Sequence, residues 1–155
     1  MVLQENTPAP DFSLKDKEGR VHTLSKIRSS FVIVYFYPKD DTSGCTIEAI
    51  EFSAQLAALR KLGAEVIGIS GGNEETKRKF CDKHNLKVTL LSDPDFIVCK
   101  KYGVYGEKIF LGKNFLGIKR TTFIIQRGNI VKVFEGVSAN GHADEVMEFL
   151  KTIRN

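Results

Sequence analysis

The stretch FVIVYFYPKDDTSGC, residues 31–45, carries the strongest structural signal in the chain. Its first seven residues, 31–37, are all apolar or aromatic, which is typical of a strand buried on both faces of a sheet. Pro38 ends the strand, and the loop 38–44 leads from there to Cys45. Because ligands and catalytic groups gather beyond the carboxyl ends of strands in open sheets, we expect this loop to lie at a functional edge.

Strand and helix patterns alternate after this stretch. Apolar residues at helical spacing predict an amphipathic helix that begins near Cys45 and is ended by Gly63. The further expected elements are a strand at 65–70, a helix at 73–84 capped by Asn73, a strand at 88–91, a helix at 95–102, a hairpin of 121–126 with 129–134 across Arg127-Gly128, and a helix at 143–153. This order predicts an α/β fold with a central mixed sheet and helices on both of its faces.

Length and composition indicate one soluble domain spanning residues 1–155. Of the 155 residues, 42% are hydrophobic, which is enough for a single core. No apolar run approaches the roughly 18 residues that span a bilayer, and the first ten residues do not resemble a secretory signal, so we expect a cytoplasmic protein with no membrane partner. The 23 basic and 19 acidic residues are interspersed, and the formal charge is +4, which argues against nucleic-acid binding.

Three cysteines, Cys45, Cys81 and Cys99, are present, and no two of them form a C-x-x-C pair. This spacing excludes the usual zinc knuckle and the vicinal dithiol of a disulfide reductase. The histidines stand alone along the chain, at positions 22, 84 and 142. We therefore expect each histidine to be solvated or near a helix cap, and we expect no metal or other cofactor.

Cys45 is the first candidate for chemistry. It lies where a loop joins the start of the expected helix, and there unpaired backbone N–H groups and the helix dipole favour an anion such as a thiolate. A cysteine at this position could equally be a small buried hydrophobic residue. Position alone leaves the two interpretations open.

The neighbours of Cys45 favour the catalytic interpretation. Pro38, Thr42 and Cys45 stand at the spacing P-x-x-x-T-x-x-C, and the segment VYFYPKDDTSGCTIEA resembles the active-site loop of peroxiredoxins, most closely the Q-type, or bacterioferritin-comigratory, branch. The resemblance continues, in the order of the family, through LLSDPD, KYGVYGEK and RTTFIIQRGNIV. It implies a thioredoxin-like fold with an N-terminal β-hairpin extension, and a thiol-dependent peroxidase.

The resemblance also implies roles for individual residues. Cys45 would be the nucleophile that attacks the peroxide, Thr42 would hydrogen-bond sulfur and peroxide, and Pro38 would shield the thiolate. Arg120, at the start of RTTFIIQ, would stabilise the thiolate and the leaving oxygen, where it would otherwise be interpreted as a solvated charge at a strand edge. Glu48 also fits the family pattern, and we interpret it as an acid in the first helical turn.

A second thiol is needed to trap the sulfenic acid that peroxide leaves on the first cysteine. Many Q-type relatives carry it five residues later, where this chain has Ile50, while others carry it at a position that Cys81 matches. Helical spacing places Cys81 on the polar side of its helix, so we expect it to be accessible, with Lys77 four residues before it favouring its thiolate. Because the two cysteines start out on different helices, we expect a disulfide to require local unwinding.

Several alternatives remain open from the sequence. Cys99 falls on the apolar face of its helix, and core packing is its expected role. The resemblance implies hydrogen peroxide or organic hydroperoxides as substrates, a thioredoxin-type or similar dithiol reductant, and a monomer or weak dimer. The other functions considered are a one-cysteine peroxidase resolved by an external thiol, a thiol-disulfide oxidoreductase, and a redox-sensing binding module.

Overall fold

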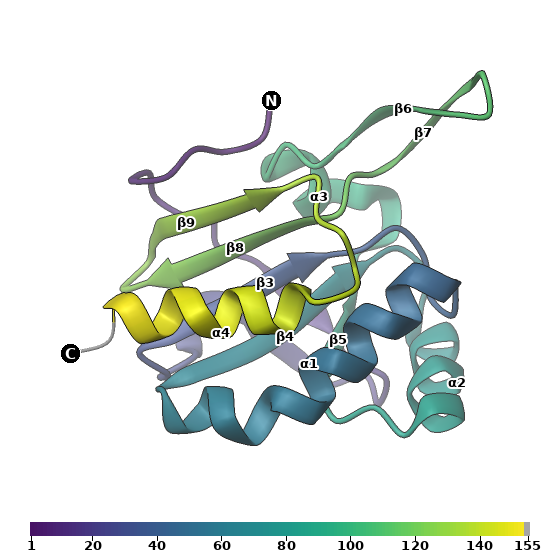
Figure 1. Cartoon of the computed structure of the whole chain (residues 1–155). Coiled ribbons are helices and arrows are strands. Elements are labelled where there is room, and N and C mark those ends of the chain that lie inside the picture. The colour runs from purple at the N-terminus through teal and green to yellow at the C-terminus, as the bar shows by residue number, and fades with distance from the viewer. Residues whose placement is uncertain (154–155) are drawn as a thin grey trace.

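A computed structural model describes residues 1–153 and shows one large sheet with a separate projecting hairpin (Figure 1). The strands are β1 (Ser13–Lys15), β2 (Val21–Thr23), β3 (Phe31–Phe36), β4 (Ala64–Ser70), β5 (Thr89–Ser92), β6 (Tyr105–Phe110), β7 (Lys113–Ile118), β8 (Thr121–Gln126) and β9 (Asn129–Glu135). The helices are α1 (Ser43–Lys61), α2 (Glu74–His84), α3 (Ile97–Lys101) and α4 (His142–Ile153), with short 3-10 turns at Leu24–Lys26 and Pro94–Phe96. Among these described residues, no helix is long and apolar enough to cross a membrane.

The large sheet is mixed, in the order β2-β1-β5-β4-β3-β8-β9. Strands β3, β4 and β5 run parallel, and β8 runs antiparallel to β3. All six residues of β3 are buried, as the apolar run in the sequence predicts for a strand covered on both faces. The short β1–β2 pair is the N-terminal hairpin that was expected, and it joins the sheet through β5.

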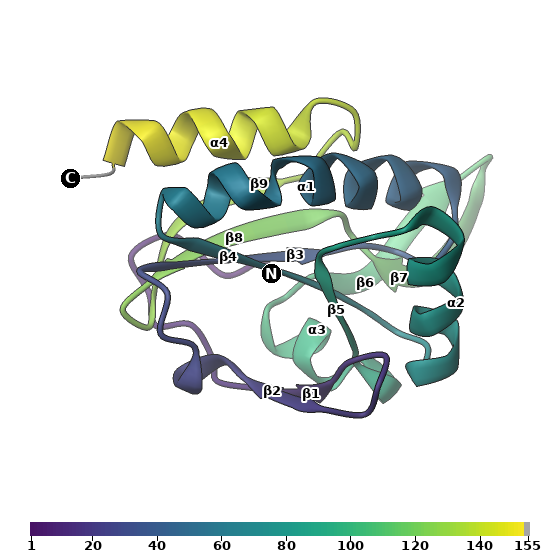
Figure 2. The same ribbon diagram turned by 90° about the horizontal axis from the view of Figure 1, so that it is seen from below.

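Helices cover both faces of the sheet, which confirms the predicted architecture (Figure 2). Successive side chains of a strand point to opposite faces, so Tyr35 packs in the core formed with α1, α2 and α4, while Val34 and Phe36 pack in the core formed with α3 and the N-terminal segment. The edge of the sheet from which α1 starts therefore has a packed layer on either side.

Helix α1 and the hairpin β8–β9 match the sequence predictions closely. The helix begins at Ser43, which places Cys45 in its first turn, and the chain leaves it through Gly63 at φ +86°, a conformation that favours glycine. In the hairpin turn, Arg127 and Gly128 both have positive φ, at 51° and 79°, as a two-residue turn of the primed type requires.

The predicted helix at 95–102 is wrong in its first part. Asp95 and Phe96 have φ values of 63° and 57°, so a regular helix begins only at Ile97. The Asp93 carboxylate explains the later start, because it accepts hydrogen bonds from the backbone N–H groups of Val98 and Cys99, at 3.1 and 2.7 Å.

The hairpin formed by β6 and β7 was not predicted. It turns at Leu111 and Gly112, which have positive φ of 52° and 77°. Its side chains are largely exposed, with Ile109 and Leu116 at 77% and 63%, so they lack the buried face by which strands are ordinarily recognised.

Candidate active site

Strand pairing brings the residues of the site together at the carboxyl end of β3. Phe36 of β3 pairs with Thr121 of β8, so Arg120, the residue just before Thr121, lies at the end of β3. The loop 38–44 leaves β3 at the same end and leads into α1. Two segments 75 residues apart in the sequence therefore meet around Cys45.

Cys45 is 1% exposed and lies beside the Arg120 guanidinium. Arg120 Nη2 donates a hydrogen bond to the Cys45 sulfur at 3.4 Å, and Nη1 donates one to Glu48 Oε1 at 2.7 Å. Burial disfavours the charged guanidinium, but Glu48 and Cys45 outweigh it and raise the pKa of Arg120 above its ordinary value. The sulfur therefore faces a permanent positive charge.

Glu48 is buried in the site, so its interpretation as an ordinary first-turn acid is wrong. Its side chain is fully enclosed and forms a salt bridge with Arg120. Its second oxygen, Oε2, has no hydrogen-bond partner among the described residues. Burial raises the pKa of Glu48 from 4.5 to about 7, although Arg120 opposes this rise. The sequence did contain a signal, because Glu48 follows Cys45 by three residues and so shares its face of the helix.

Thr42 and Pro38 lie on the outer side of the same loop. Thr42 is the N-cap residue of α1, and its hydroxyl donates a hydrogen bond to the Lys39 carbonyl at 2.9 Å. The structure shows no hydrogen bond between Thr42 and the Cys45 sulfur among the described residues. Since its proton is committed to Lys39, the exposed Thr42 oxygen can still accept a hydrogen bond from a bound molecule. Pro38 is half-buried.

Gly44 allows the guanidinium to approach the helix. A Cβ atom at this position would lie 3.0 Å from Arg120 Nη2. A larger residue would push the guanidinium away from its position against Cys45. No local pattern in the sequence indicates this requirement, because Gly44 has an ordinary φ and the close contact comes from a distant part of the chain.

Cys81 is buried, at 4% exposure, so the prediction of an accessible thiol is wrong. Lys77, one of the residues that define the polar side of this helix, is 0% exposed and paired with Asp40. Burial raises the pKa of Cys81, and this effect outweighs the opposing effect of Lys17 and Lys77. The raised pKa contradicts the expected stabilisation of the Cys81 thiolate. Cys45 and Cys81 are both free thiols within one hydrophobic cluster.

Cys99 is 0% exposed in the core on the other face of the sheet, which confirms its packing role. Burial, together with a hydrogen bond to Asp93, raises the pKa of this thiol. A thiol in this setting stays protonated and does not act as a nucleophile.

The histidines are isolated in the structure as they are in the sequence. His22 pairs with Asp16, and His84 pairs with Asp41, each at 2.8 Å. His142, at the start of α4, is buried rather than solvated, and its Nε2 lies 2.7 Å from Thr122 Oγ1. Among residues 1–153, no three His, Cys, Asp or Glu side chains are grouped so that they could hold a metal ion.

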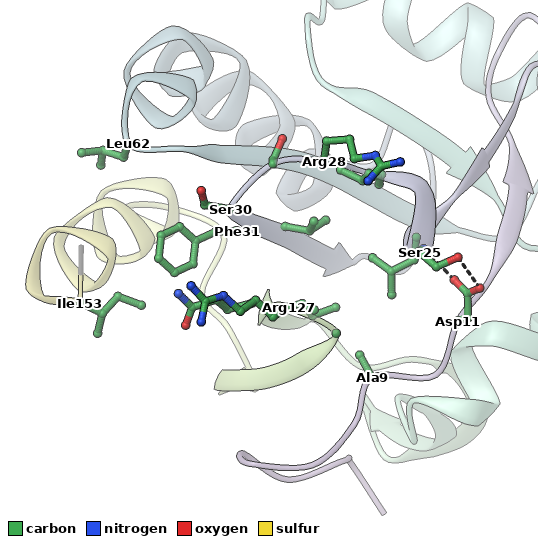
Figure 3. A pocket seen from close by; sticks show the side chains of 16 residues that line it. Ala9, Asp11, Ser25, Arg28, Ser30, Phe31, Leu62, Arg127 and Ile153 are labelled. Atoms are coloured by element: carbon green, nitrogen blue, oxygen red, sulfur yellow. Dashed lines mark hydrogen bonds between the residues drawn. The ribbon is translucent and has the colours of Figure 1, made fainter. Parts of the chain in front are cut away.

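A large cavity lies away from Cys45. It has a volume of about 710 Å³ and lies at the opposite end of β3, where Phe31, Arg127 and Ile153 line it (Figure 3). A smaller cavity of about 420 Å³ lies next to the loop and is lined by Pro38 and Phe80, among others. Because none of the reactive groups lines the large cavity, we place the site at Cys45 and not there.

The fold, the cysteine in the first turn of α1 and the arginine beside it define a thiol peroxidase of the thioredoxin-like class. Comparison with known proteins agrees. The family model described as AhpC/TSA matches residues 6–134. A putative peroxiredoxin Bcp of Helicobacter pylori strain J99 is 44% identical over 96% of this chain and 98% of its own, and peroxiredoxin Bcp of Escherichia coli K12 is 42% identical over 96% of each chain.

Solved structures show the same relationship. The bacterioferritin comigratory protein of Xanthomonas campestris superposes with a TM-score of 0.89 at 33% identity, covering 98% of this chain and 100% of that one. A structure of X. campestris peroxiredoxin Q superposes with a TM-score of 0.86 at 36% identity, covering 93% and 92% of the two chains. The chain belongs to the AhpC/TSA family and, within it, to the Bcp or Q-type branch of the peroxiredoxins, as the resemblance in the sequence predicted.

Proposed function

We propose that Cys45 reduces hydroperoxides as the nucleophile of this peroxidase. The thiolate attacks one peroxide oxygen, the O–O bond breaks, and the second oxygen leaves as water or an alcohol after taking a proton. Cys45 is thereby oxidised to a sulfenic acid, and the peroxide is reduced by two electrons. The observation that carries this proposal is the 3.4 Å contact between Arg120 Nη2 and the Cys45 sulfur.

The residues around the sulfur supply what this displacement needs. Negative charge develops on the leaving oxygen, and the Arg120 guanidinium stabilises it as it stabilises the thiolate. The unpaired backbone N–H groups of the first turn of α1 act in the same direction. The Thr42 oxygen can accept a hydrogen bond from the peroxide, and the half-buried Pro38 limits access of water to the loop.

We further propose that Cys81 resolves the sulfenic acid. Its thiol loses a proton and attacks the Cys45 sulfur, so that an S–S bond forms, the S–O bond breaks, and water leaves. Two solved X. campestris peroxiredoxin Q structures carry cysteine-to-serine substitutions at positions separated by 36 residues, the separation of Cys45 and Cys81. Because both cysteines are buried in separate helices, the turns that hold them are proposed to unwind so that the bond can form.

A thioredoxin-type dithiol protein is the proposed reductant of this disulfide, since a dithiol can exchange with an intramolecular disulfide and restore both thiols. Hydrogen peroxide and organic hydroperoxides are the proposed substrates, and one of the X. campestris structures is reported in connection with alkyl peroxide reduction. We propose that the protein acts in the cytoplasm as a monomer or weak dimer. A one-cysteine enzyme resolved by an external thiol is the alternative.

Three cysteine-to-serine variants test both parts of the proposal. Peroxide consumption with a thioredoxin system should disappear in Cys45→Ser and persist at the wild-type rate in Cys99→Ser, which is the matched control for loss of a buried thiol. Wild-type enzyme given one equivalent of peroxide should show a Cys45–Cys81 disulfide by peptide mass spectrometry.

Peroxide consumption by Cys45→Ser at the wild-type rate would reject the nucleophile. Absence of the disulfide in wild type, together with full turnover of Cys81→Ser, would reject Cys81 and establish the one-cysteine alternative.

A further inference from the structure

Helix α2, which carries Cys81, is attached to the loop that leads to Cys45. Two adjacent aspartates of this loop make the attachments. Asp40 bonds to Thr76 and Lys77 in the first half of α2, and Asp41 pairs with Lys83 and His84 at its end. Each cysteine is therefore held in place by contacts with the segment that carries the other.

The attachment through Asp40 is buried. Lys77 is 0% exposed, and its Nζ donates to Asp40 Oδ2 and to Ser70 Oγ, each at 2.9 Å, and also to the Gly71 carbonyl. The other Asp40 oxygen accepts a hydrogen bond from the Tyr37 hydroxyl at 2.6 Å. All three protons of the ammonium thus have acceptors, as a buried charge requires.

The attachment through Asp41 is exposed. The side chains of Asp41 and Lys83 are 39% and 63% exposed, so water and salt weaken this pair. Breaking a buried ion pair is costly by comparison, because each charge is left without its partner. Most of the resistance to separating the loop from α2 therefore lies in the pair of Asp40 and Lys77.

Separation of these segments is what disulfide formation requires. Lys77 precedes Cys81 by one helical turn, and Asp40 precedes Cys45 by five residues. Unwinding α2 far enough to expose Cys81 moves Lys77 out of its buried position, which breaks its bond to Asp40. The loop before Cys45 and the helix that carries Cys81 then lose their buried connection in one event.

We propose that Asp40 and Lys77 are positioning residues that set the rate of the resolving step. This inference rests on the proposed resolution by Cys81. While the pair is intact, the sulfenic acid of Cys45 stays in the folded site, where a second peroxide can oxidise it to a sulfinic acid. When the pair breaks, Cys81 reaches Cys45 and the disulfide protects the sulfur. The strength of the pair therefore determines which fraction of the sulfenic acid becomes sulfinic acid and which fraction becomes the disulfide.

The test compares Lys77→Met with Lys79→Met. Methionine replaces the lysine side chain with an unbranched apolar one in both variants, but Lys79 is exposed and its ion pair is with Glu75 on the same helix. After one equivalent of peroxide, acid quench and mass spectrometry measure how fast the Cys45–Cys81 disulfide forms. Weakening the closed state by about 1.4 kcal/mol speeds its opening about tenfold.

We expect the disulfide to form about tenfold faster in Lys77→Met, and the peroxide concentration that converts half of Cys45 to sulfinic acid to rise correspondingly. Lys79→Met should match wild type in both measurements. Equal rates in Lys77→Met and wild type, or a slower rate in Lys77→Met, would overturn the proposal.

Two further variants separate this role from a general loss of structure. Asp40→Asn removes the charge from the other side of the pair, should act in the same direction, and carries the test if Lys77→Met does not fold. In a Cys81→Ser background, Lys77→Met should change the sensitivity to sulfinic acid formation far less than it does when Cys81 is present, because no resolving thiol captures the opened site. A change of similar size in that background would show that Lys77 acts on Cys45 directly and would overturn the proposal.

The same measurements distinguish failure of the proposed resolution by Cys81 from failure of the proposed role of Asp40 and Lys77. If wild type forms no Cys45–Cys81 disulfide, the proposed function is wrong about resolution, and the role of the pair falls with it. If the disulfide forms at the same rate with and without Lys77, resolution by Cys81 stands and only the positioning role is rejected.

Discussion

Replacing Glu48 with glutamine should change how the stability of this protein depends on pH. Glu48 is enclosed beside Arg120, and burial raises its pKa from 4.5 in the unfolded chain to about 7 in the folded one. Glutamine has nearly the same shape and retains an acceptor for Arg120 Nη1, but it does not titrate. The difference in unfolding free energy between variant and wild type therefore isolates the ionisation of one carboxyl group.

The direction follows from the order of the two pKa values. Below pH 4.5 the carboxyl is protonated in both states and contributes nothing. Between pH 4.5 and 7 the unfolded chain loses this proton first, so ionisation favours unfolding, and above pH 7 the penalty is constant. The interval from 4.5 to about 7, at about 1.4 kcal/mol per pH unit, corresponds to about 3 kcal/mol. The unfolding free energy of Glu48→Gln, relative to that of wild type, should therefore rise by this amount between pH 4 and pH 8.

Urea unfolding at several pH values between 4 and 8 measures the effect. Both proteins should carry Cys45→Ser, so that the neighbouring thiol is absent from the comparison. Glu75→Gln is the matched control for replacing a glutamate by glutamine, because Glu75 is 66% exposed on α2. A pH-independent difference between Glu48→Gln and wild type would refute the assignment of a raised pKa to Glu48.

Three other variants test the geometry of the site and of α2. Gly44→Ala should slow the reaction of Cys45 with peroxide about tenfold, because its Cβ would lie 3.0 Å from Arg120 Nη2 and displace the guanidinium, and stopped mixing measures the rate. Arg120→Lys should slow the same reaction about 100-fold, since one ammonium cannot reproduce the fork that contacts two partners, and an unchanged rate would contradict this. Asn73→Ala should lower the unfolding free energy by about 1 kcal/mol in urea, because the Asn73 side chain accepts from the Thr76 N–H in the capping box of α2.

The sequence was sufficient for most of the fold because its signals there are local. The buried run of β3, the capping Asn73 of α2 and the Arg127-Gly128 turn each depend on residues close together in the chain. The β6–β7 hairpin escaped prediction because its exposed apolar side chains give no clear alternation. The late start of α3 depends on the Asp93 carboxylate, whose capping role the sequence analysis did not recognise.

The site was less predictable, because charge was taken as a sign of exposure. Glu48 and Lys77 are both buried, and each is neutralised by a partner far away in the sequence, Arg120 and Asp40 respectively. Placing Lys77 in solvent also placed Cys81 there, since the two share a helical face. Only the family resemblance, and not helical spacing, connected Arg120 with Cys45 before the structure was known.

The pairing of Phe36 with Thr121 determines when Arg120 comes to lie beside the Cys45 sulfur in a newly made chain. During synthesis β3 and α1 emerge well before β8, so the helix that holds Cys45 can form while Arg120 is still absent. A register shift of one residue in β8 would point the guanidinium to the opposite face of the sheet. The thiol of a newly made chain therefore lacks the cation that lies beside it in the folded protein until the antiparallel strand docks in the correct register.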